Sequence, residues 1–371
     1  MLIYFFTTFI SFLFACFMYY FSKKAVIREA VPSSRYIKEK AIYEKSPHKY
    51  SFFLMVCCWL PLFLVSALRW EVGTDFDGVY LRGFVSIANG GTFPWEAGYI
   101  FLNKAVSTVS NDPAWIFILT SFIFLTFTFK SIYDSSVDIR LSILLLVVDG
   151  FYFQSMNGIR QWITLAMFLY SIKFIRDKKF VPYLVVILLA STIHLSALIF
   201  IPVYFFCQLR IPPRKGISIL LISIVCMPFV RNVFFYIVSL TKYKWYLDSS
   251  YNKMNYSITD TIVGFILVFL GYFYYKNSKG DKTYSILMNL QLLALIFSLY
   301  SAVIILADRL VPCFTASQLL LIPEILSQEK NRKTRTILTI LIMTFFILTC
   351  CYTYGVLGWS NVLPYHSIFS R

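Results

Sequence analysis

The segment Arg69-Trp-Glu-Val-Gly-Thr-Asp-Phe-Asp-Gly78 opens a polar stretch that continues through Tyr80 and Arg82 to Pro94-Trp-Glu-Ala-Gly98. The stretch contains two arginines and four carboxylates, together with several aromatic residues, and long apolar segments lie on both sides of it. Because those apolar segments are suited to a bilayer, the polar stretch is expected to be held at a membrane surface. It is one of the few parts of the chain that can do chemistry.

The composition excludes a soluble globular protein. Of the 371 residues, 58% are hydrophobic and only 14% are charged, whereas about a quarter of the residues in soluble domains are charged. Apolar segments recur along nearly the whole length, and no polar segment between them is long enough to fold separately. The expected fold class is therefore all-α, a polytopic helical membrane protein in which residues 1–371 form a single integral-membrane domain.

The formal net charge of +16 could suggest a nucleic-acid partner. The lysines and arginines, however, lie mostly in short loops between apolar segments, where positive charge keeps a loop on the cytoplasmic side. We therefore expect no nucleic-acid partner. The eight cysteines lie in or beside apolar segments at spacings that match neither a zinc site nor a disulfide framework, so we expect them to act as small apolar residues.

Hydropathy and charge together predict about twelve transmembrane helices with both termini outside. A basic cytoplasmic loop covers 23–50, and outer loops cover 69–110 and 241–260. Within the first outer loop, residues 99–109 are too short to cross and are predicted to form an interfacial or re-entrant helix. The predicted spans are 2–22, 51–68, 114–129, 141–156, 159–175, a pair within 180–208 that turns at His194, 217–240, 261–275, 284–306, 311–326 and 336–356.

Four arginines remain on the outer side once the cytoplasmic charges are assigned: Arg69, Arg82, Arg160 and Arg309. Guanidinium groups suit phosphate oxygens, because they form two parallel hydrogen bonds and never lose their charge. Several of them in one cavity would hold a diphosphate. The alternative is that each arginine pairs with an acid and fixes the outer end of a helix. The acids available for such pairs are Glu71, Asp75, Asp77, Glu96 and Asp308.

Asp75, Glu96 and His194 are the candidates for a general base. Asp75 and Asp77 are two residues apart in a glycine-flanked loop, where their carboxylates could approach one hydroxyl or one cation, although two aspartates alone indicate a metal site only weakly. The membrane interface is expected to raise the pKa of Glu96, which would suit a base. His194 lies at an outer turn, where it either accepts a hydroxyl proton or is a hydrogen-bonded group of the core.

Several motifs occur in an order that resembles one protein family. The motifs are Arg69-Trp-Glu-Val-Gly-Thr-Asp75, Glu96-Ala-Gly-Tyr99, Arg160-Gln161, Ala190-Ser-Thr-Ile-His194, Asp308-Arg309 and Leu363-Pro-Tyr365. They cover nearly the whole chain, and together they resemble the EpsG-like, Wzy-type family of bacterial surface polysaccharide polymerases. One departure is Phe76, where a tyrosine is commoner in such sequences.

The resemblance implies a multi-pass glycosyltransferase of the bacterial cytoplasmic (inner) membrane with its active face towards the periplasm or exterior. Such an enzyme joins undecaprenyl-diphosphate-linked oligosaccharides into O-antigen, as in lipopolysaccharide, or into exopolysaccharide. Its implied partners are these lipid-linked substrates, membrane lipids and a chain-length regulator, and we expect no cofactor and no metal. The alternative functions are a transporter (flippase) or a glycan ligase that acts on the same lipid-linked oligosaccharide.

The resemblance also suggests roles for individual residues. Asp75, Glu96 or His194 would deprotonate the acceptor hydroxyl, and the sequence does not choose among them. Three arginines, Arg69, Arg160 and Arg309, would hold the diphosphate. The full set of substrate-binding candidates is Arg69, Asp77, Arg82, Arg160, Gln161, Asp308 and Arg309. The aromatic residues that either stack on sugars or belong to the interfacial aromatic belt are Tyr80, Trp95, Trp245 and Tyr251.

Overall fold

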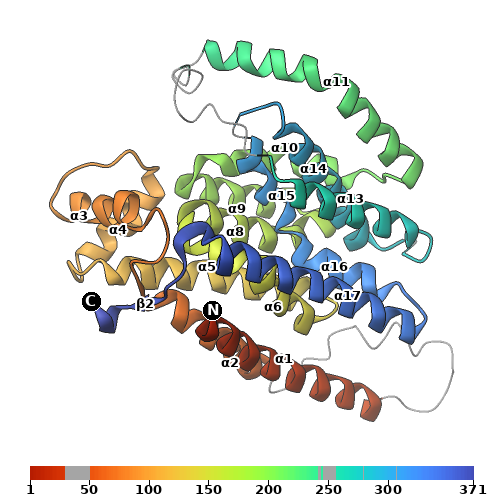
Figure 1. The fold of residues 1–371 in the computed structure, drawn as a ribbon, viewed down its shortest axis with the longest axis horizontal. Helices are drawn as coiled ribbons and strands as arrows, with labels where there is room; N and C mark the ends of the chain where they lie inside the picture. The colour runs from red at the N-terminus through yellow and green to blue at the C-terminus, as the bar shows by residue number, and fades with distance from the viewer. Residues whose placement is uncertain (30–50, 241–243, 245–255, 279, 306) are drawn as a thin grey trace. The chain divides into compact units, whose positions relative to one another are not determined.

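The computed structural model describes residues 1–29, 51–240, 244, 256–278, 280–305 and 307–371. This part of the chain is mostly helical, as Figure 1 shows, which confirms the expected all-α class. It divides into two compact units. The first comprises Met1–Phe174, Lys179–Ile201 and Arg332–Arg371, and the second comprises Ile175–Lys178 and Pro202–Asn331. The expectation that the chain is one integral-membrane domain stays a prediction.

Long apolar helices form the body of the first unit. Helix α1 packs against α2 and α6, α2 also packs against α5, and α17 packs against α6. The sides that face one another are buried, while many outward-facing apolar side chains are exposed, as in a protein surrounded by lipid. The bounds are α1 (Leu2–Glu29), α2 (Ser51–Ala67), α5 (Ala114–Ser135), α6 (Ile139–Val148), α7 (Phe151–Asn157), α8 (Ile159–Arg176), α9 (Phe180–Ile193) and α17 (Arg332–Cys350).

Two breaks divide helices of this unit. Helices α6 and α7 meet at an angle of 49° at Gly150, which has a φ of +86° and leaves room for the Tyr354 side chain of η4 (Cys351–Val356). Helix α9 ends before His194, whose backbone is extended, and η2 (Leu195–Ile199) and α10 (Phe200–Gln208) follow. The predicted turn at His194 is therefore confirmed.

The polar stretch after α2 folds into four short elements: β1 (Arg69–Trp70), a π-helical turn η1 (Phe76–Leu81), α3 (Arg82–Ala88) and α4 (Ala97–Ser107). Strand β1 pairs antiparallel with β2 (His366–Ser367), so that Arg69 lies opposite Ser367 and Trp70 opposite His366. Two 3₁₀ turns flank β2, η5 (Trp359–Asn361) and η6 (Ile368–Ser370). Helix α4 has 11 residues, so it is too short to cross a bilayer, as predicted.

The second unit is built around α14 (Lys282–Tyr300), which packs against α11, α13, α15 and α16. Gly271 of α13 allows close packing, because a side chain there would overlap Met288 of α14. Buried polar groups pair across these helices, including the Gln318 amide, which donates to Gln291 Oε1 at 3.0 Å. The other bounds are α11 (Pro213–Ser239), α13 (Ile258–Phe273), η3 (Ala307–Leu310), α15 (Val311–Thr315) and α16 (Gln318–Ser327).

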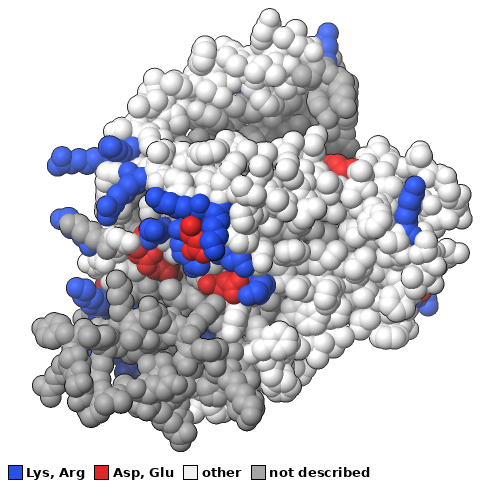
Figure 2. Space-filling view, turned by 180° about the vertical axis from the view of Figure 1, so that it is seen from behind, with Lys and Arg blue, Asp and Glu red and all other residues white. Residues whose placement is uncertain are grey.

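Five helices of the described chain are long and apolar enough to cross a membrane, or seven spans if each of two bent helix pairs counts as one. Further helices, including α2, α9 and α13, are apolar but shorter. On the face in Figure 2 most of the visible charged side chains gather in one region, at the left of the view, and most of the rest of the visible surface is uncharged. The chain is a multi-pass membrane protein, and the number of twelve spans stays a prediction. The predicted loops 23–50 and 241–260 lie largely outside the described residues.

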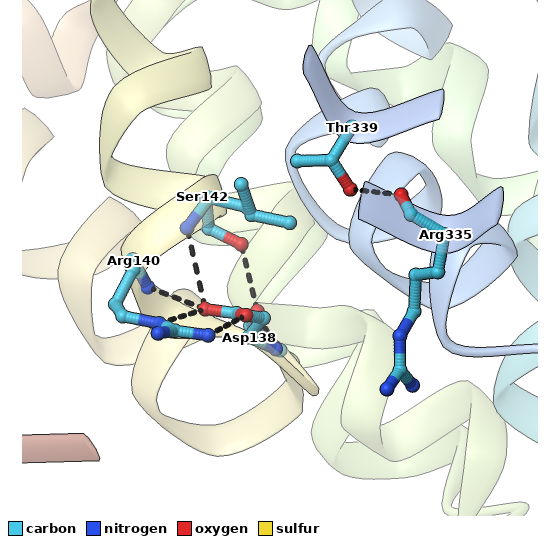
Figure 3. A network of polar contacts seen from close by, with 7 residues as sticks. Asp138, Arg140, Ser142, Arg335 and Thr339 are labelled. Carbon is cyan, nitrogen blue, oxygen red and sulfur yellow. Dashed lines mark hydrogen bonds and ion pairs between the residues drawn. The ribbon is translucent and has the colours of Figure 1, made fainter. Parts of the chain in front are cut away.

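One charged network of the first unit is drawn in Figure 3. Asp138 caps α6 through the Arg140 amide and also binds the Arg140 guanidinium, with Nη2 2.6 Å from Oδ2. The same guanidinium lies 3.7 Å from the centre of the Tyr19 ring. Figure 3 also draws Arg335 of α17, whose carbonyl oxygen accepts a hydrogen bond of 2.8 Å from the Thr339 hydroxyl. The charge pattern predicts that Arg140 and Arg335 both lie on the cytoplasmic side, and this orientation stays a prediction.

Candidate functional site

The Glu96 carboxylate holds together two of the predicted functional residues. One oxygen, Oε2, forms an ion pair with Nη1 of Arg160. The other, Oε1, lies 2.9 Å from Nδ1 of His194 and accepts a hydrogen bond of 3.0 Å from the amide of Leu195. The three charged or titratable side chains are each partly exposed, between 19% and 29%. The cluster Glu96–Arg160–His194 is thus reachable from solvent and contains a carboxylate, a guanidinium and an imidazole.

Local backbone structure brings these groups together. Glu96 stands at the N-cap of α4 in an extended conformation, and His194 lies in the break between α9 and η2. Helix α4 packs against α9 at Gly98, where a Cβ atom would lie 2.8 Å from the carbonyl oxygen of Thr192 and would overlap its hydroxyl. Only a residue without a side chain allows this approach. Gly98 therefore sets the distance between the Glu96 and His194 backbones.

Buried aromatic rings support the Arg160 side chain. Its guanidinium carbon lies 5.8 Å from the ring centre of Trp95 and 5.9 Å from that of Tyr99. The backbone amide of Arg160 donates to the Tyr80 hydroxyl at 3.4 Å, and all three rings are at most 8% exposed. The structure thus packs Tyr80 and Trp95 under the arginine. The other two aromatic candidates, Trp245 and Tyr251, lie outside the described residues.

The electrostatics of Glu96 differ from the sequence-based expectation. Burial by itself raises the pKa of Glu96, but the hydrogen bonds from His194 and the Leu195 amide and the charge of Arg160 outweigh it and lower the pKa from 4.5 to about 2. The expected upward shift was wrong, because the interface is not the main influence on this carboxylate. At neutral pH Glu96 is ionised and is a poor proton acceptor.

His194 has the geometry of a positioned base. Its Nδ1 faces Glu96, and a neutral imidazole that donates from Nδ1 leaves Nε2 as the acceptor nitrogen. Within the described parts of the chain, no residue forms a hydrogen bond with this Nε2. A carboxylate that fixes the tautomer of a histidine also stabilises the imidazolium that forms when the base takes a proton.

The loop that carries Asp75 is fixed to the end of α7 by one side chain, two residues before α8 begins. Asn157 Oδ1 accepts hydrogen bonds from the Thr74 hydroxyl at 2.7 Å and from the Asp75 amide at 3.0 Å. Gly73, with a φ of +108°, lets the loop pass against the backbone of α7. Asn157 therefore links the Asp75 loop to the segment that presents Arg160, a contact that could not be predicted from the sequence.

The remaining candidates of the first unit differ in exposure. Asp77 and Arg82 are exposed, and neither side chain bonds to another residue of the described ranges. Gln161, beside Arg160 in α8, is half-buried. In the second unit, Asp308 and Arg309 belong to η3, where Asp308 is half-buried and Arg309 is exposed. The convergence of Arg69, Arg160 and Arg309 on one diphosphate stays a prediction.

Arg69 is buried, with 1% of its surface exposed. Its Nη1 donates to the Ser66 carbonyl oxygen and to Ser121 Oγ at 2.8 Å, and its guanidinium carbon lies 5.3 Å from the Phe117 ring centre. Burial lowers the pKa of Arg69 to about 10, so the group keeps its charge at neutral pH. No carboxylate of the described residues pairs with it, and a narrow polar hollow lies beside it.

The segment after η4 secures the strand that carries Arg69. The Arg371 guanidinium binds both carboxylate oxygens of Asp112, at 2.8 and 2.6 Å, and lies 4.6 Å from the centre of the Trp70 ring. The Tyr365 hydroxyl donates to the carbonyl oxygen of Val65 at 3.0 Å. The motif Leu363-Pro-Tyr365 thus has a structural role next to β1, which its sequence alone did not reveal.

A comparison with known families agrees with the resemblance described above. The model of the EpsG family matches residues 52–367, which include the whole Glu96–Arg160–His194 cluster and both strands. No curated protein and no solved structure matches the chain. The family resemblance inferred from the motifs is therefore confirmed.

Proposed function

This chain belongs to the EpsG family, and from that premise we propose that it is a membrane glycosyltransferase of polysaccharide biosynthesis. It joins polyprenyl-diphosphate-linked oligosaccharide repeat units at the outer face of the cytoplasmic membrane. Family membership supports a role in polysaccharide biosynthesis. The observation that supports an enzyme is the Glu96 carboxylate, which binds an arginine and a histidine at once. A flippase for the same substrate has no need of a histidine held as a proton acceptor.

The proposed reaction forms one bond and breaks another. A hydroxyl oxygen of the acceptor sugar attacks the anomeric carbon of the donor sugar, while the bond from that carbon to the lipid diphosphate breaks. The hydroxyl proton goes to the enzyme, and the diphosphate leaves with the electron pair of the broken bond. Positive charge develops on the donor sugar and negative charge on the diphosphate, so both a base and fixed cations stabilise the transition state.

His194 is the proposed base. It accepts the hydroxyl proton at Nε2, while Glu96 holds Nδ1 and stabilises the imidazolium that results. The low pKa of Glu96 favours this assignment over Glu96 as the base itself, because a carboxylate of pKa about 2 takes up a proton weakly at neutral pH. Asp75, fixed by Asn157, is proposed to bind the acceptor hydroxyls.

Arg160 is the proposed contact for the diphosphate in the first unit. Its side chain is 19% exposed, and one nitrogen binds Glu96 while other N–H groups are left for phosphate oxygens. The exposed Arg82 and Arg309 are proposed as further contacts, with Asp77, Gln161 and Asp308 binding sugar hydroxyls. Arg69, which is buried, is proposed to stabilise the strand pair rather than to touch the substrate.

The purified full-length chain, incubated with one lipid-linked repeat unit as both donor and acceptor, tests the proposal. A polymerase lengthens the glycan into a ladder, whereas a flippase only moves it across a vesicle and a ligase needs a different acceptor. His194→Ala is expected to abolish the ladder. His366→Ala is the matched control, because His366 is exposed in β2 and lies outside the cluster. Ladders of equal length from wild type and His194→Ala would remove the base from the proposal.

A further inference from the structure

A cavity of about 370 Å³ lies in the second unit, and none of its lining residues belongs to the Glu96–Arg160–His194 cluster. Three segments form its walls: the end of α8, the end of α10, and the turn before α14 together with the first residues of that helix. Its size is in the range of pockets that hold small organic ligands. Four basic side chains line it, Arg176, Lys178, Arg210 and Lys282, with Asp281 as the only acid among the lining residues.

Most of this positive charge is not neutralised by ion pairs within the part of the chain that the structure describes. Arg176 is paired with Asp177, with Nε 3.0 Å from Oδ1. Lys178, Arg210 and Lys282, in contrast, form no ion pair with any residue of the described ranges. The Asp281 carboxylate accepts a hydrogen bond from the Tyr284 amide at 3.1 Å and thereby caps α14. The cavity therefore presents surplus positive charge at a helix start, where the backbone amides add to it.

Hydrogen bonds between the helices fix the backbone under these cations. The Gln208 amide donates to the Ile175 carbonyl oxygen at 2.8 Å, which joins α10 to α8. Asn289 of α14, 2% exposed, donates to the Leu209 carbonyl oxygen at 2.8 Å and so joins the end of α10 to α14. The cavity is thus formed by packed helix ends and not by side chains of one loop. A ligand would meet a site that is already organised.

The cavity also has apolar walls. Ile175, Cys207 and Ile286 line it and are buried, and Leu209 lines it with 54% of its surface exposed. The three loops that meet here are those that the charge pattern predicts to be cytoplasmic. The cavity thus combines surplus basic side chains with apolar walls on the predicted cytoplasmic side. Basic pockets of this kind bind the phosphate headgroups of anionic lipids.

We propose that this cavity binds a phosphate-bearing ligand, with the headgroup of an anionic phospholipid of the inner leaflet as the expected source. Arg210, Lys178 and Lys282 contact the phosphate oxygens, and the apolar walls contact the glycerol and the first part of an acyl chain. A water-soluble organic phosphate offers the same oxygens and is the alternative source. The site is separate from the proposed catalytic cluster, so its occupancy is measured by binding and not by polymerisation.

Native mass spectrometry of the detergent-purified full chain tests the lipid source. Phosphatidylglycerol is added in one arm and the zwitterionic phosphatidylcholine in another. Wild type is compared with the double variant Arg210→Ala/Lys282→Ala and with the matched control Arg214→Ala/Lys215→Ala, which removes the same charge from the exposed start of α11. Each lost cation is expected to weaken phosphatidylglycerol binding about fivefold, or about 25-fold for the pair, while the control and the phosphatidylcholine arm change little.

Calorimetric titration with inorganic pyrophosphate, in the same detergent and without lipid, tests the soluble source. The site is supported if the affinity for either probe falls in the double variant and not in the control. The probe whose affinity falls then shows whether the phosphate comes from a lipid or from a soluble compound. The proposal is overturned if wild type and double variant bind both probes equally. It is also overturned if the control loses as much affinity as the double variant. If the double variant fails to insert, Lys282→Gln alone gives the same comparison, because the Lys282 side chain is exposed and bears no structural contact among the described residues.

Discussion

Glu96 Oε1 lies 2.9 Å from His194 Nδ1, although 98 residues separate the two in the chain. The contact depends on two local features, a helix that begins at Glu96 and a helix that ends just before His194. It gives the imidazole a fixed tautomer and the carboxylate a second hydrogen-bonding partner beside Arg160. The candidate site is therefore one connected unit, and a change at any member is expected to affect the others.

Replacing Glu96 with glutamine is expected to slow glycan extension by about 10²- to 10⁴-fold. The amide keeps the shape of the side chain but no longer stabilises an imidazolium, and it leaves Arg160 without its counter-charge. The measurement is the initial rate of extension by purified protein. Glu71→Gln is the matched control, because it makes the same chemical change at an exposed position of the same segment. A rate equal to wild type in Glu96→Gln would contradict the role of the pair.

The stability contributed by Glu96 is expected to depend on pH in one direction only. The pKa of Glu96 is about 2 in the folded chain and 4.5 without its partners. Because the folded value is the lower one, the ionised cluster stabilises the fold above about pH 4.5, and this contribution is lost as the pH falls towards about 2. Thermal unfolding of wild type and Glu96→Gln should therefore differ by a constant amount near neutrality. Below about pH 4.5 the difference should shrink, and a growing difference would refute the assignment.

Replacing Gly98 with alanine is expected to reduce both stability and activity. The new methyl group would overlap the Thr192 hydroxyl and push α4 away from α9, at a cost of about 1–3 kcal/mol. The same displacement separates Glu96 from His194. Melting temperature and extension rate are the two readouts. Gly78→Ala is the control, since no heavy atom lies within 4 Å of a Cβ atom there, and equal effects of the two variants would exclude the packing explanation.

Replacing Arg69 with lysine separates a structural role from substrate binding. An ammonium group does not reproduce the planar guanidinium, whose Nη1 donates to both the Ser66 carbonyl and the Ser121 hydroxyl and whose carbon lies 5.3 Å from the Phe117 ring centre. The variant is therefore expected to lose about 1–3 kcal/mol of stability with its KM unchanged. The exposed Arg82→Lys should change stability by less than about 0.5 kcal/mol. A raised KM in Arg69→Lys without a change in melting temperature would show instead that Arg69 binds the diphosphate.

The sequence predicted the parts of the fold that depend on apolar runs and loop charge. The turn at His194 followed from the need to keep Arg210 and its basic neighbours on the cytoplasmic side, and the structure places the helix break at that residue. The prediction that the segment after Glu96 forms a helix that does not cross the membrane also followed from the sequence, because the apolar run there is too short. Both predictions rest on local properties, which a sequence displays directly.

The sequence could not predict which acid each outer arginine binds or which strands pair. Five acids were available to the outer arginines, and in the structure Glu96 binds Arg160 of α8 as well as His194, which the packing of α4 on α9 brings to it. Strands β1 and β2 have two residues each, too few to show a period, so their pairing left no signal. The burial of Arg69 rests on contacts with Ser66, Ser121 and Phe117, residues of α2 and α5 that the sequence does not bring together.

The pairing of β1 with β2 has a consequence for biosynthesis. A ribosome releases Arg69 and Trp70 some three hundred residues before Ser367 and His366, the residues that lie opposite them. Throughout that interval the edge of β1 has no neighbour, and the Trp70 ring has no Arg371 above it. The outer segment next to the candidate site therefore reaches its final structure only after α17 has entered the bilayer. Assembly of this region is thus a late step in the folding of the protein.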